Sequence, residues 1–169
     1  MKNNILLACL LSTMTLPSLA ADAVNIKVTG KVIASPCVVN NGSSDLAVDL
    51  SDIQASSLAV ASATSPAVDF SLDFKNCPAG TTSVKAVFSG TPDSTNPKYY
   101  QNTGTATGVA VGLYQASNGF GRDNGTYIVQ PVLEDGTVSI ALQARAFSLA
   151  GAPTPGTISA TIVATMEYN

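Results

Sequence analysis

The chain has 169 residues, of which 8 are Lys or Arg and 11 are Asp or Glu, and it contains no His, so its formal net charge at pH 7 is −3. This sparse, acidic charge disfavours binding to nucleic acid or to an anionic membrane surface. Without His, a Ser-His-Asp or Cys-His catalytic arrangement is impossible, and the commonest metal ligand is missing. We therefore expect no enzyme, and no catalytic, cofactor-binding, metal or small-molecule substrate site.

Residues 1–20 have the features of a secretory signal peptide. Lys2 provides the positive charge, Ile5 to Leu16 forms an apolar stretch, and Ser18-Leu19-Ala20 is a small-x-small cleavage site. The apolar stretch is too short for a membrane span. Leu7-Ala8-Cys9 is an alternative signal for lipidation at Cys9, with only a short apolar run before it. We expect cleavage after Ala20 and an exported mature chain.

The mature chain begins with an alternating segment that ends at Pro36-Cys37 without any turn signal. Its apolar positions are Val24, Ile26, Val28 and Val32, and Gly30 interrupts their row. This period of two is that of a half-buried β-strand. A long alternating strand at a free terminus is either the first strand of the chain's own sandwich or a strand that pairs with another molecule, because soluble proteins rarely leave such an edge uncovered.

Export also decides how the cysteines are interpreted. Cys9 leaves with the signal peptide, so that Cys37 and Cys77 remain. In an oxidising compartment two thiols most simply form one disulfide, and the sequence has no C-x-x-C redox motif. Closing a loop of about 40 residues stabilises the fold by roughly 4 kcal/mol in the entropic account.

The middle of the chain is dominated by short alternating segments separated by turn residues. Ser51 to Ala63 has no apolar stripe and allows at most a single helical turn, while Asp123-Asn124-Gly125 predicts a hairpin turn. Short strands at this spacing indicate an all-β sandwich. The strands that we expect here are residues 68–75, 84–88, 109–113 and 138–142.

The last fourteen residues, from Gly156 to Asn169, carry the clearest alternation in the chain. Every second residue is apolar, and the residues between are small or polar. The pattern predicts a strand with one buried face. The apolar positions are Ile158, Ala160, Ile162, Ala164, Met166 and Tyr168.

These features together resemble the pilins of the chaperone–usher pathway, and in particular the minor subunits of type 1 fimbriae. The resemblance spans the mature chain and includes the family's C-terminal signature, a penultimate Tyr with a Gly fourteenth from the end, here Tyr168 and Gly156. The other matching stretches are the arm with Gly30, Pro36-Cys37, Asn76-Cys77-Pro78-Ala79-Gly80-Thr81, Phe88-Ser89-Gly90 and Gln143-Ala144-Arg145-Ala146.

The resemblance implies an incomplete immunoglobulin-like sandwich that lacks its seventh strand, with residues 21–34 as an N-terminal donor-strand extension and residues 35–169 as the pilin domain. The final strand, Gly156 with the row from Ile158 to Tyr168, would border an open groove. A periplasmic chaperone would fill this groove with one of its strands. In the fibre the row Val24, Ile26, Val28, Gly30 and Val32 of the next subunit would replace that strand. Gly30 would pass a shallow part of the groove, or else simply mark a bulge.

The implied function is that of a structural subunit, a tip adaptor of a fimbria that mediates cell adhesion. It would be delivered by the chaperone to an outer-membrane usher and reach the cell surface beside other pilins, with a tip adhesin as one candidate neighbour. The alternatives are the major shaft pilin of the same pathway and a self-contained secreted lectin-like domain. For the lectin-like domain, Tyr99, Tyr100, Phe120 and Tyr127 are candidate sugar contacts. We interpret Asp69 and Asp73, and likewise Asp45, Asp49 and Asp52, as solvated positions and not as an acid pair or a calcium cage.

Overall fold

The computed structural model describes residues 25–32, 35–39 and 42–169. The chain divides into two compact units, Met1–Lys31 and Val32–Asn169, and each is described by itself. The signal peptide, Cys9 and Val24 lie outside the described residues, as do positions 33 and 34. The predictions for them therefore stay predictions.

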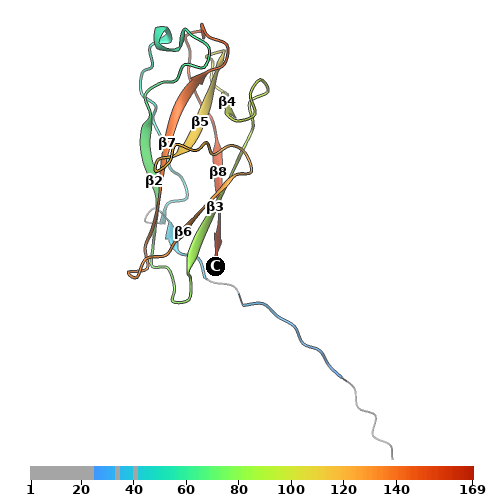
Figure 1. The fold of residues 1–169 in the computed structure, drawn as a ribbon. Helices are drawn as coiled ribbons and strands as arrows, with labels where there is room; N and C mark the ends of the chain where they lie inside the picture. The colour runs from blue at the N-terminus through green and yellow to red at the C-terminus, as the bar shows by residue number, and fades with distance from the viewer. Residues whose placement is uncertain (1–24, 33–34, 40–41) are drawn as a thin grey trace, which may run out of the picture. The chain divides into compact units, whose positions relative to one another are not determined.

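The regular secondary structure of the second unit is mainly β-strand, as the alternating pattern predicts, and the strands are joined by loops and turns (Figure 1). It also contains a short 3-10 turn, η2, and no helix among the described residues is long and apolar enough to cross a membrane. The elements are β1 Val38–Val39, η2 Ala55–Leu58, β2 Val68–Lys75, β3 Ser83–Gly90, β4 Tyr100–Gln101, β5 Val109–Gln115, β6 Tyr127–Pro131, β7 Val138–Ser148 and β8 Ile162–Tyr168.

The strands form two sheets, with the orders β1-β2-β7-β5-β4 and β6-β3-β8, and every strand pair is antiparallel. The apolar core lies between the sheets, because alternate residues of each strand point to the same face. Phe74 and Ile140 come from the first sheet and Phe88 from the second, and all three are fully buried. This arrangement is the expected sandwich.

The structure confirms the strand at 68–75 and extends the other predicted middle strands. It also adds β6, which the sequence did not indicate. The turn at Asp123-Asn124-Gly125 exists, with Gly125 at a φ of 86°. The prediction that it forms a hairpin is wrong, since the strands before and after it, β5 and β6, belong to different sheets. The turn is instead held to β3, where the Gly90 N–H donates to Asn124 Oδ1 and the Gly125 N–H to the Phe88 carbonyl.

The two ends of the domain are built differently. At the base, Cys37 and Cys77 form the predicted disulfide, and the Cys77 N–H donates to the Gly136 carbonyl at 3.1 Å. The C-terminus lies at the same end, because the Thr82 and Ser83 N–H groups donate to the Asn169 carbonyl. At the other end, the head, lie η2 and the approach to β8 (Figure 1). β8 thus runs from head to base.

Candidate strand-acceptor site

The last strand, β8, is an edge strand. It pairs with β3 from Ile162 opposite Gly90 to Tyr168 opposite Val84. Within the described part of the chain, no strand pairs with its other edge. An open edge presents a row of backbone donors and acceptors to any strand that approaches it.

The side chains along β8 and the residues before it alternate as predicted. The even-numbered residues are half-buried and pack against the core, whereas the odd-numbered residues are exposed, and Val163 has an exposed fraction of 53%. We call the even-numbered set the acceptor row: Ile158, Ala160, Ile162, Ala164, Met166 and Tyr168. The row is a strip of the core that the domain does not fully cover.

The backbone of the acceptor row faces the same opening. The Asn169 N–H donates to the Ser83 carbonyl at 3.1 Å, and the Ser83 N–H donates to the Asn169 carbonyl at 3.2 Å. In an antiparallel ladder, every second residue is bonded in this way to the same neighbour. Residue 169 is odd, so the odd residues of β8 point their N–H and C=O groups to β3 and the even residues point theirs to the open edge.

The same alternation continues before β8 begins. The Ala106 N–H donates to the Thr157 carbonyl at 3.0 Å, and the Thr103 N–H donates to the Ser159 carbonyl at 2.8 Å. The odd residues are again the ones bonded within the domain. From Ile158 to Tyr168, one added strand can therefore take up the free backbone groups and also cover the apolar row.

Gly156 has a different role from the acceptor row. It is exposed, and a Cβ placed on it would lie 2.4 Å from the Ala106 backbone nitrogen. Only a residue without a side chain allows the two backbones to approach so closely. Threonine hydroxyls then fix the crossing, since the Thr157 N–H donates to Thr105 Oγ1 at 2.8 Å. Gly156 thus positions the start of the row and does not line it.

Tyr168 ends the acceptor row at the base. Burial raises the pKa of its hydroxyl above the usual value of 10.0. The next residue is anchored by the start of β3, where the Thr82 N–H and Thr82 Oγ1 both donate to the Asn169 carbonyl, at 2.5 and 3.1 Å. This anchoring explains why the clearest strand of the chain can stand at its end without fraying.

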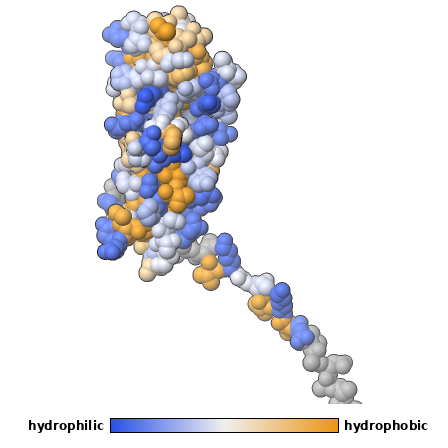
Figure 2. All heavy atoms as spheres, in the orientation of Figure 1, coloured by the Kyte–Doolittle hydropathy of each residue, from blue (hydrophilic) through white to orange (hydrophobic). Residues whose placement is uncertain are grey.

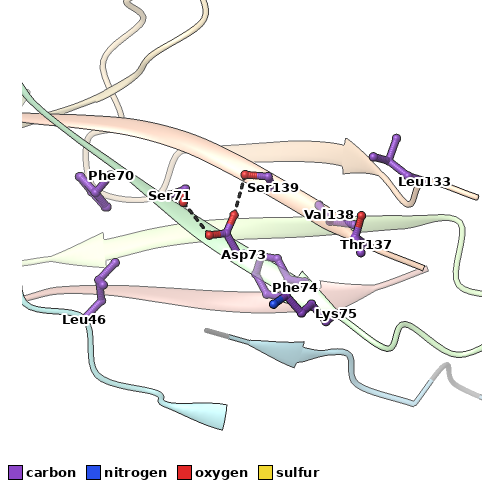
Figure 3. Close-up of a pocket in the computed structure, with 10 residues that line it drawn as sticks. All are labelled: Leu46, Phe70, Ser71, Asp73, Phe74, Lys75, Leu133, Thr137, Val138 and Ser139. Carbon is purple, nitrogen blue, oxygen red and sulfur yellow. Dashed lines mark hydrogen bonds between the residues drawn. The ribbon is translucent and has the colours of Figure 1, made fainter. Parts of the chain in front are cut away.

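A second open edge lies on the other sheet. β2 pairs with β7 along its length, but β1 covers only Phe74 and Lys75 on its other side. A cleft of about 570 Å³ adjoins this edge, with apolar walls that include Leu46 and Phe70 (Figure 3). Sequence analysis did not predict this cleft, although the alternation of Leu46, Val48 and Leu50 could have indicated an apolar segment here.

Asp73 is the acidic residue of this cleft. Its carboxylate accepts hydrogen bonds from Ser139 Oγ and Ser71 Oγ, each at 2.7 Å (Figure 3). These bonds, first that from Ser139 and then that from Ser71, lower its pKa below 3.8. The carboxylate is thus held ionised by its own sheet.

The described part of the arm, residues 25–32, is extended and not part of any strand. Hydrophobic and hydrophilic residues alternate along it (Figure 2). Its apolar side chains are exposed, with exposed fractions of 84% for Ile26, 89% for Val28 and 98% for Val32. A Cβ added at Gly30 would meet no atom within 4 Å. The structure therefore brings the predicted acceptor positions together, whereas the donor positions stay a prediction.

The aromatic residues considered as sugar contacts do not form one surface. Tyr100 is buried, and its hydroxyl donates to the Arg122 carbonyl at 2.8 Å, so a sugar cannot reach it. Tyr99 stacks on Phe147 with 3.9 Å between ring centroids. Phe120 and Tyr127 remain exposed.

Two antiparallel sheets around one core, with the last strand open along its edge, define an incomplete immunoglobulin-like sandwich of the pilin type. The profile of the family described as "Fimbrial protein" matches residues 26–169, and the chain belongs to this family. It is 39% identical over 168 residues to "Protein FimG" of Escherichia coli (strain K12), covering 99% of this chain and 98% of that protein. It is 34% identical over 184 residues to "Type-1 fimbrial protein, A chain" of Escherichia coli, covering 99% of this chain and all of that protein.

Solved structures share the fold. The P pilus rod subunit PapA aligns with a TM-score of 0.66 at 23% identity, covering 80% of this chain and 100% of that chain. A subunit from the structure of a chaperone–usher pilus aligns with a TM-score of 0.66 at 22% identity, covering 91% of this chain and 100% of that chain.

Proposed function

We propose that this fimbrial subunit assembles by strand donation, in which the arm of one subunit, residues 21–34, completes the open sheet of the next. The acceptor row supports the proposal most directly. Its side chains are half-buried on the core, and its backbone groups point to an edge that no described strand occupies. A donated strand satisfies both requirements at once.

The arm has the composition that such a site needs. Burying one aliphatic side chain contributes roughly 1.5–3 kcal/mol, so the four apolar residues from Val24 to Val32 supply about 6–12 kcal/mol before the cost of ordering the arm. Three of the four are described, and all three are exposed.

The role that follows is structural and not enzymatic. Before assembly, a strand from a periplasmic chaperone would cover the acceptor row, and an outer-membrane usher would pass the subunit to the cell surface. There it would stand beside neighbouring pilins, with a tip adhesin as one candidate neighbour, in a fibre that mediates adhesion. Full-length similarity to FimG favours a minor, adaptor-type subunit. Full-length similarity to the type-1 A chain supports the second candidate, a major shaft subunit.

Peptide capture tests the proposal. A peptide of residues 21–34 should bind the mature chain, and the same peptide with Gly30→Leu should bind roughly 5- to 150-fold more weakly, because overpacking costs about 1–3 kcal/mol. Thr29→Leu, which adds bulk on the opposite face of the arm, is the matched control and should bind like the unchanged peptide.

The outcomes separate two claims. If the chain captures no peptide, strand donation is wrong. Equal binding of the Gly30→Leu and unchanged peptides would leave strand donation standing but remove the role of Gly30 at a shallow part of the groove. The subunit that carries Gly30→Leu should unfold at the same temperature as the wild type, since the added side chain has open space around it.

A further inference from the structure

We infer that the head of the domain is a docking surface for the base of the next subunit, so that consecutive subunits touch body to body as well as through the arm. The inference rests on the proposed strand donation. The surface is a cavity of about 400 Å³ with mostly apolar walls. The walls that matter here are Ile53, Leu58, Val109, Pro153, Pro155 and Ile158.

The cavity is continuous with the acceptor row. Ile158 is the first residue of the row and also lines the cavity. It packs against the main core and against a second apolar cluster that contains Leu58 and Val109. A strand that covers the row up to Ile158 therefore ends at the cavity's mouth.

The direction of the donated strand decides which part of the donor reaches the cavity. All strand pairs of the domain are antiparallel, and an added strand that continues this pattern runs against β8. Its N-terminal end then lies near Tyr168 and its C-terminal end near Ile158. The acceptor row spans eleven positions, from 158 to 168, and so does the arm from 24 to 34.

Because the arm and the acceptor row have the same length, only a short connection remains between the donated arm and its own domain. When donor residue 34 lies opposite Ile158, the donor's Cys37 comes three residues later, within about 10 Å of extended chain. The base of the donor must therefore lie against the head of the acceptor. Because the contacting surfaces differ, the contact is head-to-tail and repeats along an open fibre.

The base offers a side chain that fits an apolar cavity. Cys37 is bonded to Cys77, and Cys77 is hydrogen-bonded to Gly136 in the tight turn between β6 and β7. Leu133 stands in the same turn, with an exposed fraction of 59%. Apolar contact has to hold the two subunits together, because Asp52 beside the cavity and Glu134 beside Leu133 have the same charge.

The test compares two variants of the mature full chain, Leu133→Asp at the base and Phe120→Asp as control. Both side chains are exposed, and Phe120 lies in the loop between β5 and β6 and not in the turn between β6 and β7 that contains Leu133. The measurement is the dissociation rate of a two-subunit complex in an excess of the peptide of residues 21–34. We expect the Leu133→Asp complex to dissociate at least about tenfold faster than the wild-type complex, which corresponds to about 1.4 kcal/mol. The Phe120→Asp complex should dissociate at the wild-type rate.

A positive charge placed in the cavity of the acceptor subunit tests whether this cavity is the docking site. Ala55 is exposed and lines the cavity, so Ala55→Lys should slow the dissociation of the Leu133→Asp donor, because charges attract within a Debye length of about 10 Å. If Ala55→Lys does not slow the dissociation of the Leu133→Asp donor, the assignment of this cavity as the docking site is wrong.

Failure of the inference can be told from failure of strand donation. If the free peptide is not captured, strand donation itself is wrong. If the peptide binds all variants equally and Leu133→Asp dissociates like Phe120→Asp, the arm alone holds the subunits and the docking surface is wrong.

Discussion

A charge introduced into the acceptor row should abolish strand capture, and Ile162→Asp is the sharpest form of this test. Ile162 opens β8 opposite Gly90, and its half-buried side chain packs on the core. Its neighbour Val163 points the other way and has an exposed fraction of 53%. Val163→Asp is therefore a matched control, since it places the same charge one residue away on the outer face.

The magnitude follows from what a donated strand would cover. Burial of the isoleucine side chain contributes about 1.5–3 kcal/mol, and a buried carboxylate without a partner costs several kcal/mol more. The sum, at least about 3 kcal/mol, weakens binding by a factor of at least roughly a hundred. Stability of the uncomplexed domain should fall by less, because Ile162 is only half-buried there.

The assay is titration of the mature wild type, Ile162→Asp and Val163→Asp with a labelled peptide of residues 21–34, followed by fluorescence anisotropy. Thermal unfolding of each protein, without peptide, checks that the variants are folded. We expect loss of binding for Ile162→Asp and less than a threefold change for Val163→Asp. Equal weakening by the two substitutions would refute the assignment of the two faces of β8.

Two further predictions concern the domain itself. Gly156→Val should lower the free energy of unfolding by about 1–3 kcal/mol, because the new Cβ would meet the Ala106 backbone. Gly30→Ala should leave the free energy of unfolding unchanged, and chemical denaturation measures both variants. Burial and the charge of Asp123 raise the pKa of Tyr100 to about 12 from 10.0, so its contribution to stability is present below pH 10 and is lost as the pH rises towards 12. Urea unfolding between pH 9 and 12 should show this decline, and Tyr100→Phe should flatten part of it.

Alternation along the chain was sufficient to predict the strands with one buried face. The predicted strand at 68–75 has the same bounds as β2, and the predicted buried positions from Ile158 to Tyr168 are those that pack on the core. The period of two is a local property, because successive side chains of any strand point to opposite faces. The disulfide between Cys37 and Cys77 was predictable for a similarly simple reason, since the chain after residue 20 contains no other cysteine.

Which edges stay open could not be predicted from alternation. β6, Tyr127–Pro131, has no clear period and is a strand because β3 pairs with it. The turn at 123–125 looks like a hairpin turn but joins two sheets, since β5 pairs with β7 and not with β6. Nor does the sequence bring Leu58 next to Ile158 at the head cavity. The sequence by itself determined the face of each strand, whereas strand partners and cavities were decided only by the tertiary structure, because pairing depends on contacts between residues far apart in the chain.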